Sequence, residues 1–580
     1  MLILAPFIAS GSASALDADL VFVQVPKDAY DVETRFDPGH RYVDGCRIVS
    51  LKRDGELVNL TSEFASACDP AVSFDGETIF FAGKRQADDE WQLWRMNADG
   101  ENKTHIDTGL SDCVSPLPVG NLFHLNDASP SPRMVFVSAG HGWQNEGSGG
   151  KAYSLYACWM DGSGVQRLTY NLSSDFDPCV LPNGRVIFSS WQRFFDGSSG
   201  SKLPTAKLLA TNIDGADTML YCGLDEPLSH IIQSAPSPDG RVYFIEDGAL
   251  SYVEQRRPLH TYQTLANGIF QSPCPIDEES LIISKRSDWN DVYSLVRLST
   301  KTGEVIKPIA GSAQYHCLDA QVLAPHPKVD GRSSVVNVEK AIGELYCLDV
   351  YESQIDVMAN LEPGSVKHVR VIEGLPITEN WLPAKQTMPY PRRVLGVAPV
   401  EKDGSFHLDV PADTPIALQL IDENGTTIEA HRNWMWVRPG ERRGCIGCHE
   451  DPELTPPNRL SQAIVKPAFD VTKPLSDDER VDFLTSILPI IERQCSTCHN
   501  DIHKLDLSYD PTDSRRHPYD IHEKLLYGEM NYVNPGFSDT SPIIEILMME
   551  PHEIGEETRT VFQQWIDLGA HYSIWPGEKQ

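Results

Sequence analysis

The residues best suited to chemistry in this chain form two short motifs of the pattern C-x-x-C-H. Their four thiols are Cys445, Cys448, Cys495 and Cys498, and their imidazoles are His449 and His499. Two thiols three positions apart can reach the two vinyl groups of one porphyrin, and the adjacent imidazole can ligate its iron. A zinc knuckle or a redox C-x-x-C is the alternative, but zinc sites usually join two C-x-x-C pairs into one four-ligand set. The spacing therefore predicts two covalently bound c-type haems.

The iron ligands opposite the motif histidines have to come from elsewhere in the chain. For the second haem we expect His499 on one side and His552 on the other, which gives a six-coordinate iron suited to electron transfer. The alternatives to His552 are His571, Met549, His522, His517 and His503. Acidic residues follow His449, with no further His or Met close by. We therefore expect an iron open to a small molecule, unless a histidine from the N-terminal part fills the position.

Bulk composition limits the classes of partner. The chain has 580 residues, which is too long for a single core, and a formal net charge of −33. Such a charge disfavours nucleic acids and anionic membrane surfaces as partners. We expect a small-molecule substrate and a redox partner protein or companion subunits instead. No apolar segment of the sequence is long enough to span a bilayer.

The first fifteen residues predict export. A short apolar run ends at Ala13-Ser-Ala15, as in a signal sequence with its cleavage site, although no Lys or Arg precedes the run. Covalent haem attachment takes place outside the bacterial cytoplasm, so the two motifs indicate the same compartment. We therefore expect residues 1–15 to be a signal-like segment and the protein to be periplasmic.

Two kinds of hairpin alternate along residues 16–330. One kind joins two strands through a tight turn that ends in Gly, at 46–60, 92–100, 154–162, 208–215 and 294–303. The other kind opens with Pro near its start, at 69–81, 177–188 and 234–244. Two hairpins in each repeat of roughly 40–60 residues make a four-stranded blade. The segment therefore predicts a six-bladed β-propeller, whose repeats resemble those of TolB-like propellers.

Several ligand-type residues fall at the starts of the predicted inner strands. They are Asp69, Cys113, Asp177, Cys179, His230, Cys274, His316, Cys317 and Asp319. We interpret most of them as turn formers and small buried residues, with a site at the mouth of the channel as the alternative. The nine cysteines outside the motifs are likewise interpreted mainly as small buried hydrophobic residues.

The remainder of the chain predicts two haem-carrying parts. Residues 331–470 read as a small β-sandwich with the first haem, and residues 471–580 as an α-helical cytochrome c-like domain with the second. Helices are expected at 477–494 and 556–568. Residues that suit a porphyrin face or its propionates precede the first motif: Trp434, Trp436, Arg438, Arg442 and Arg443. Ordinary core and surface roles are the alternative for each. The predicted fold class is mainly β.

The order of these parts, together with two local sequences, resembles the hydrazine synthase alpha subunit family. The sequences are P-G-E-R-R-G-C-I-G-C-H-E at residues 439–450 and W-I-D-L-G-A at residues 565–570. The resemblance implies redox chemistry on a small nitrogenous compound at the middle haem, with electrons relayed through the C-terminal haem. It also implies a zinc ion held by His449 with an Asp and a Cys of the propeller, for which Asp69 and Cys179 are candidates.

This chain departs from the family pattern at one position. Four residues after the motif histidine, where the resemblance implies an iron-ligating Tyr, the residue is Glu453. The iron of the first haem then falls either to His449 or to the carboxylate of Glu453, and these two are the candidate catalytic residues. The resulting prediction is a periplasmic dihaem oxidoreductase. A non-catalytic electron carrier that docks through its propeller is the main alternative, and an assembly module with structural haems is a third.

Overall fold

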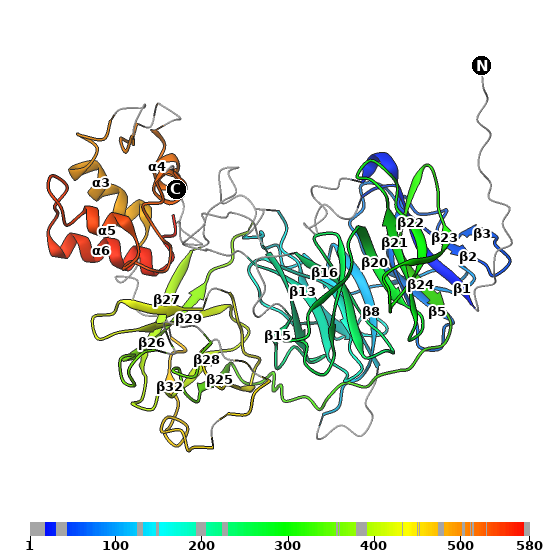
Figure 1. Cartoon of the computed structure of the whole chain (residues 1–580), viewed down its shortest axis with the longest axis horizontal. Helices are drawn as coiled ribbons and strands as arrows, with labels where there is room; N and C mark the ends of the chain where they lie inside the picture. Colours follow the sequence, from blue (N-terminus) through cyan, green and yellow to red (C-terminus); the bar gives the residue numbers. More distant parts are fainter. Residues whose placement is uncertain are drawn as a thin grey trace.

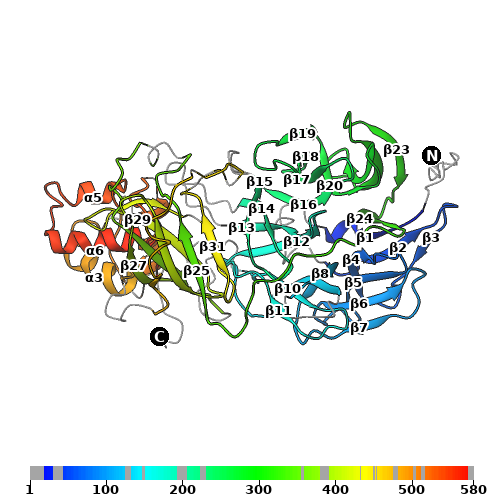
Figure 2. The ribbon, with the colours of Figure 1, turned by 90° about the horizontal axis from the view of Figure 1, so that it is seen from below.

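The structure of the chain, a computed structural model, is mainly β, as predicted (Figure 1). It describes residues 18–30, 43–124, 132–146, 150–192, 205–222, 230–354, 358, 360–378, 391–431, 433–448, 451, 453–456, 458–473, 481–500, 505–510, 512, 516–528 and 530–572. The expected signal-like segment, residues 1–15, lies outside these. Figures 1 and 2 both place the C-terminal helices at one end of the molecule and the first strands at the other.

Six four-stranded sheets form the N-terminal group of elements. From inner to outer strand, the first sheet is β24 (Tyr315–Leu323), β1 (Asp19–Pro26), β2 (Arg47–Leu51) and β3 (Leu57–Asn59), and the second is β4 (Ser66–Val72), β5 (Thr78–Lys84), β6 (Gln92–Asn97) and β7 (Thr104–Ile106). The third is β8 (Cys113–Asn121), β9 (Pro132–Ser138), β10 (Ser154–Trp159) and β11 (Gln166–Arg167), and the fourth is β12 (Ser174–Val180), β13 (Val186–Gln192), β14 (Thr205–Thr211) and β15 (Met219–Cys222). The fifth is β16 (Ile231–Pro236), β17 (Arg241–Glu246), β18 (Ala249–Glu254) and β19 (Gln263–Ala266), and the sixth is β20 (Ile269–Pro275), β21 (Ser280–Arg286), β22 (Ser294–Ser299) and β23 (Val305–Ala310). Each inner strand contacts the inner strand of the next sheet, and β24 contacts β4. The sheets therefore form a closed, propeller-like ring, in which β1 and β24 pair antiparallel and join the two ends of the segment.

Each inner strand contains one residue with left-handed backbone, at the point where its pairing shifts register. These residues are Asp69, Ser115, Asp177, Gln233, Ser272 and Asp319. Their side chains connect neighbouring sheets: the carboxylate of Asp69 accepts hydrogen bonds from the backbone N–H and the hydroxyl of Ser115, at 2.9 and 2.7 Å. The hydroxyl of Ser272 donates to Asp319 at 2.6 Å. The aspartates at the strand starts are therefore bulge residues that tie the ring together, in line with the preferred interpretation.

Two further four-stranded sheets form the middle group. The strands are β31 (Arg442–Cys445), β25 (Ile342–Cys347), β28 (Phe406–Pro411) and β32 (Phe469–Asp470) in one sheet, and β27 (Arg392–Pro399), β26 (His368–Gly374), β29 (Ile416–Ile421) and β30 (Thr427–Ala430) in the other. Buried and half-buried residues alternate along β28, as in a strand with one face on a core. Side chains from both sheets share that core, and Cys445 and Cys448 pack at its edge.

The C-terminal group is helical. Its elements are η3 (Phe483–Ile487, a π-helical turn), α3 (Leu488–Gln494), α4 (Pro518–Tyr527), α5 (Pro542–Ile546) and α6 (Glu556–Asp567). Asp482 caps the first of these helices by accepting the N–H of Thr485 at 2.7 Å. The helical turn therefore begins at Phe483, and residues 477–480 of the predicted helix lie outside the described residues. The ring contains a 3₁₀ turn, η1 (Lys27–Ala29), after β1. None of the helices in the described ranges has the length and apolar character that crossing a membrane requires.

Candidate functional site

The first C-x-x-C-H motif continues from strand β31. This strand pairs in parallel with β25 and places Cys445 opposite Cys347. Beyond the strand, the N–H of Leu348 donates to the carbonyl of Cys445 at 3.0 Å, and the N–H of Cys448 donates to the carbonyl of Glu352 at 3.1 Å. The turn that carries both thiols is therefore anchored to the segment after β25.

The glycines of the motif are required by this close docking. A Cβ on Gly447 would lie 1.9 Å from the carbonyl oxygen of Glu352, well inside van der Waals contact. A Cβ on Gly444 would lie 2.4 Å from the ring of Tyr346. Both residues therefore let the backbone approach more closely than any other residue type would allow.

The donor set of the first motif fits covalent attachment of a porphyrin. Cys445 and Cys448 are half-buried, lie on one turn and pack against the core between the two middle sheets. Both residues are thus partly accessible while packing on an apolar core, as thioether formation requires. The imidazole of the motif, His449, lies outside the described residues.

The aromatic and basic residues before the motif have mainly structural roles. Trp436 is fully buried, and the indole N–H of Trp434 donates to Glu146 at 2.8 Å. The guanidinium of Arg438 is buried and donates to Asp413 at 2.6 Å. Arg442, whose side chain is 53% exposed, pairs with Glu344. These contacts are core and surface contacts of the kind that the alternative interpretation describes.

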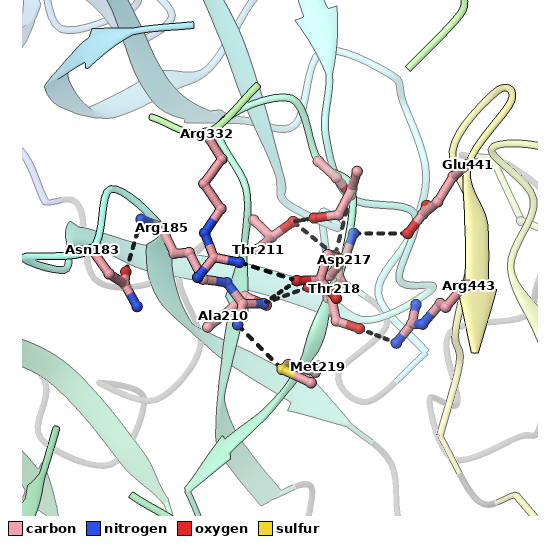
Figure 3. A network of polar contacts seen from close by, with 12 residues as sticks. Asn183, Arg185, Ala210, Thr211, Asp217, Thr218, Met219, Arg332, Glu441 and Arg443 are labelled. Atoms are coloured by element: carbon pink, nitrogen blue, oxygen red, sulfur yellow. Dashed lines mark hydrogen bonds and ion pairs between the residues drawn. The ribbon is translucent and has the colours of Figure 1, made fainter. Parts of the chain in front are cut away.

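A polar network joins the residues just before the first motif, Glu441 and Arg443, to the ring (Figure 3). The carboxylate of Glu441 accepts the backbone N–H of Asp217 at 2.8 Å, and burial raises the pKa of this carboxyl group. Arg443 donates to the backbone carbonyl of Thr218. On the ring side, Arg185 donates to the carbonyl of Ala210 at 2.8 Å and lies beside Asp217. Strand β31 is thus held from both sides, by β25 and by the ring.

The residues that follow the motif make a second connection to the ring. The buried carboxylate of Asp451 lies 2.7 Å from Nε2 of His260, in the loop between β18 and β19. Glu453 accepts the backbone N–H of Leu259 at 3.0 Å and pairs with Arg257 at 3.3 Å. Glu453, predicted as a candidate iron ligand, is therefore engaged with the ring. His260 and Arg257 were not singled out in the sequence, because nothing in their local pattern distinguishes them from surface loop residues.

The second motif follows helix α3 without a break. The N–H of Cys495 donates to Ile491, and the N–H groups of Cys498 and His499 both donate to the carbonyl of Cys495, at 3.1 and 3.0 Å. The thiols are thus on a helical turn at the edge of the C-terminal core, which Cys495 contacts. Burial raises the pKa of the Cys495 thiol, whereas Cys498 is exposed.

His552 is the predicted second ligand that the structure brings close to His499. The centroids of the two imidazole rings are 5.6 Å apart and their planes are inclined by 33°. Two opposite nitrogen–metal bonds of about 2 Å each would place the ring centroids roughly 6 Å apart, so the two rings need to separate by less than about 1 Å to share one metal. The two histidines are 53 positions apart in the sequence, and the loop after α5 brings them together.

The other residues considered as the second ligand lie in different surroundings. His571 is fully buried, and burial lowers its pKa to about 4. His522 is buried with Nε2 at 2.7 Å from the carbonyl of Ala570, and His517 accepts the N–H of Tyr519 at the start of α4. Met549 is 58% exposed, and His503 lies outside the described residues. Of the placed candidates, His552 has the geometry that suits a shared metal.

The thiols outside the motifs are mostly core residues, as interpreted from the sequence. Seven of the nine are buried, and Cys179 and Cys274 are half-buried. Burial raises the pKa of Cys46 and Cys158 to about 12, so these thiols stay protonated. Asp69 and Cys179, the candidate zinc partners, both line a cavity of about 820 Å³ formed by the inner strands and by residues 324–327.

Comparison with known proteins finds similarity along nearly the whole chain. Residues 364–450 match the family model described as hydrazine synthase alpha subunit middle domain. Hydrazine synthase subunit alpha from Kuenenia stuttgartiensis is 22% identical over 97% of this chain and 92% of its own length. The solved structure of Kuenenia stuttgartiensis hydrazine synthase has 20% identity, a TM-score of 0.80, and coverage of 97% of this chain and 95% of that one. The resemblance inferred from the two motifs is therefore confirmed: the chain is similar to the hydrazine synthase alpha subunit over nearly its whole length, and residues 364–450 match the middle domain of that family.

Proposed function

We propose that the protein is an exported, periplasmic dihaem c-type oxidoreductase that acts on a small nitrogenous compound. The observation that carries this proposal is that the matched middle domain ends in the first motif, whose thiols are fixed by backbone hydrogen bonds at the edge of its core. In this proposal Cys445 and Cys448 hold one haem, and Cys495 and Cys498 hold the other. A haem supplies one-electron redox chemistry and a site for a small ligand when one axial position is open.

The proposed organisation assigns one role to each part of the chain. Residues 16–330 are a six-bladed β-propeller, a proposal supported by the ring of six four-stranded sheets. Residues 331–470 carry the first haem and residues 471–580 the second, with residues 1–15 as the export signal. The curated relative is named as a subunit, so we propose that companion subunits or a redox partner protein bind this chain as well.

In this proposal the second haem relays electrons. His499 and His552 are its two axial ligands, which the 5.6 Å separation of their rings supports. An iron with two imidazole ligands is saturated and has a modest potential, properties that suit electron transfer and exclude substrate binding.

The first haem is the proposed site of small-molecule chemistry. The carboxylate of Glu453 already accepts the N–H of Leu259 and pairs with Arg257, which supports His449 and not Glu453 as the protein ligand of this iron. If His449 holds this iron, the haem would keep a free coordination position at which a small molecule can bind. Glu453 then acts by holding the segment after the motif against the ring.

The experiment that tests the proposal is expression in a host with haem-maturation machinery, followed by mass spectrometry. We expect a mass increase of two haems for the unaltered chain, and of one haem for Cys445→Ala or Cys448→Ala with the spectrum of the second haem unchanged. Cys179→Ala, which removes a thiol outside the motifs, should retain both haems. A colourless protein of apoprotein mass would refute the proposal.

The ligand assignment of the second haem has its own test. Replacing His552 with Ala should convert that haem from low to high spin, because the iron loses one of two strong-field nitrogen ligands. His517→Ala, which removes an exposed histidine of the same group of helices, is the matched control and should leave the spectrum unchanged. A low-spin spectrum in the His552 variant would contradict the assignment.

A non-catalytic electron carrier is the second candidate function. It is favoured by the engagement of Glu453 with the ring, because this contact removes one of the two candidate catalytic residues from the first iron. Carbon monoxide distinguishes the two functions. Binding to one of two ferrous haems supports the oxidoreductase, and binding to neither supports the carrier.

A further inference from the structure

Three potential metal ligands meet where the segment after the first motif contacts the ring. Nε2 of His260 and carboxylate oxygens of Asp451 and Glu453 all lie within 4.8 Å of one another. His260 comes from the ring, and the two acidic residues follow the first motif by a few positions. The side chain of Asp451 is 3% exposed and that of Glu453 16%, so two carboxylates are brought together with little access to water.

The backbone around these side chains is organised before any ion binds. In the ring loop, the hydroxyl of Thr261 donates to the carbonyl of Arg257 at 2.7 Å and accepts the N–H of Glu254 at 2.9 Å. On the opposite side, Oδ1 of Asp451 accepts the N–H of Glu453 at 2.9 Å. This leaves Oδ2 of Asp451 directed at His260, so little conformational freedom is lost when a ligand binds.

The charges of the group favour a divalent cation. Asp451 and Glu453 carry two negative charges in a partly dehydrated position, where their mutual repulsion is weakly screened. The basic side chain beside them, Arg257, is 58% exposed and contacts Glu453 at 3.3 Å, which makes it a weak and replaceable partner. A doubly charged ion bound by a neutral imidazole and two carboxylates would give a neutral cluster.

We propose that His260, Asp451 and Glu453 form a divalent metal site, with an ion of the zinc type as occupant. Imidazole nitrogen with carboxylate oxygen is a ligand set that Zn²⁺ accepts, and three protein ligands leave one position for water or a small molecule. Bonds of about 2.0–2.1 Å in tetrahedral geometry need roughly 3.3 Å between ligand atoms. The His260–Asp451 pair at 2.7 Å therefore opens by about 0.6 Å. The site joins the ring to the haem-motif segment and does not depend on the proposed redox activity.

Zinc binding to the purified full-length protein tests the site. The protein is treated with a chelator and titrated with Zn²⁺ against a chromophoric competitor. We expect one ion bound at micromolar or lower concentration, and a loss of more than about 100-fold in affinity for His260→Ala, because removing a ligand costs more than removing its supporting partners. His105→Ala, an exposed histidine on β7, is the matched control and should bind as the unaltered protein does.

Arg257→Ala separates a metal site from a simple ionic contact. If the arginine competes with the ion, its removal should tighten zinc binding by about two- to fivefold. This exposed position is expected to tolerate Ala without loss of folding, so the result does not depend on the stability of the His260 variant. Absence of bound zinc in the unaltered protein, or equal affinity in the His260 and His105 variants, would overturn the proposal. The haem content of each sample is measured separately, so a failed metal site is distinguished from failed haem attachment.

Discussion

Arg438 offers a sharp test of how the middle part is fixed to the ring. Its side chain is 4% exposed, and it donates to the carboxylate of Asp413 at 2.6 Å, to the hydroxyl of Tyr170 at 3.1 Å and to the carbonyl of Asp214 at 3.1 Å. Tyr170 and Asp214 belong to the ring, and Asp413 to the middle part. Replacing Arg438 with Ala removes all these contacts at once.

The expected loss in the free energy of unfolding follows from the burial of the Arg438–Asp413 ion pair. Removing one partner of a buried ion pair typically costs about 3–5 kcal/mol, because the other charge is left without compensation. Asp413 is 29% exposed and recovers some hydration, so we expect a loss near the lower limit, about 3 kcal/mol. Arg442→Ala is the matched control, because this nearby arginine is 53% exposed and its pair with Glu344 should contribute about 0–1 kcal/mol.

Urea unfolding followed by tryptophan emission measures both variants. Trp434 and Trp436 are buried in the same segment and report on its loss of structure. We expect the transition to shift strongly for Arg438→Ala and little for Arg442→Ala. If the two variants unfold within about 1 kcal/mol of each other, the inference that Arg438 fixes the middle part to the ring is wrong.

Two further predictions follow from the local geometry. Gly447→Ala should lower the occupancy of the first haem, because a Cβ there meets the carbonyl oxygen of Glu352. Gly555→Ala is the control and should leave the haem occupancy unchanged, because nothing lies within 4 Å of a Cβ at that position. Intact mass spectrometry of the two variants measures the haem occupancy. Asp567 has a pKa raised to about 6 by burial, so the folded protein holds this proton more tightly than the unfolded chain does. Stability should therefore fall as pH rises from about 4 to about 6, by up to about 3 kcal/mol. Asp567→Asn keeps an acceptor for the N–H of Ser538 and should flatten this dependence in unfolding measurements; an unchanged slope would contradict the assignment.

Local patterns allowed much of the fold to be predicted. The tight turns rest on glycines such as Gly100, whose φ is +89°, and a turn of this kind depends only on neighbouring residues. Helix α6 was predicted at 556–568 and extends over Glu556–Asp567, because its acidic start and the glycine after it are local signals. The ring of sheets followed from the spacing of such hairpins. The cap that Asp482 provides before Phe483 was not predicted, since it depends on side-chain geometry.

The role of Glu453 could not be predicted from the sequence. Its position after the first motif suggested an iron ligand, but the fold places it against Arg257 and Leu259, almost 200 positions earlier in the chain. His260 meets Asp451 in the same way. Contacts of this kind depend on how whole sheets pack, and the residues that make them have no distinguishing local pattern.

The sequence by itself determined the haem chemistry that we propose for this protein, because the spacing of two thiols and one imidazole within five residues is a local property that does not depend on the fold. Tertiary structure alone decided which distant side chains lie close together, such as His552 beside His499. The physical reason is that packing of the separate cores, and not the covalent chain, sets the distance between residues far apart in the sequence.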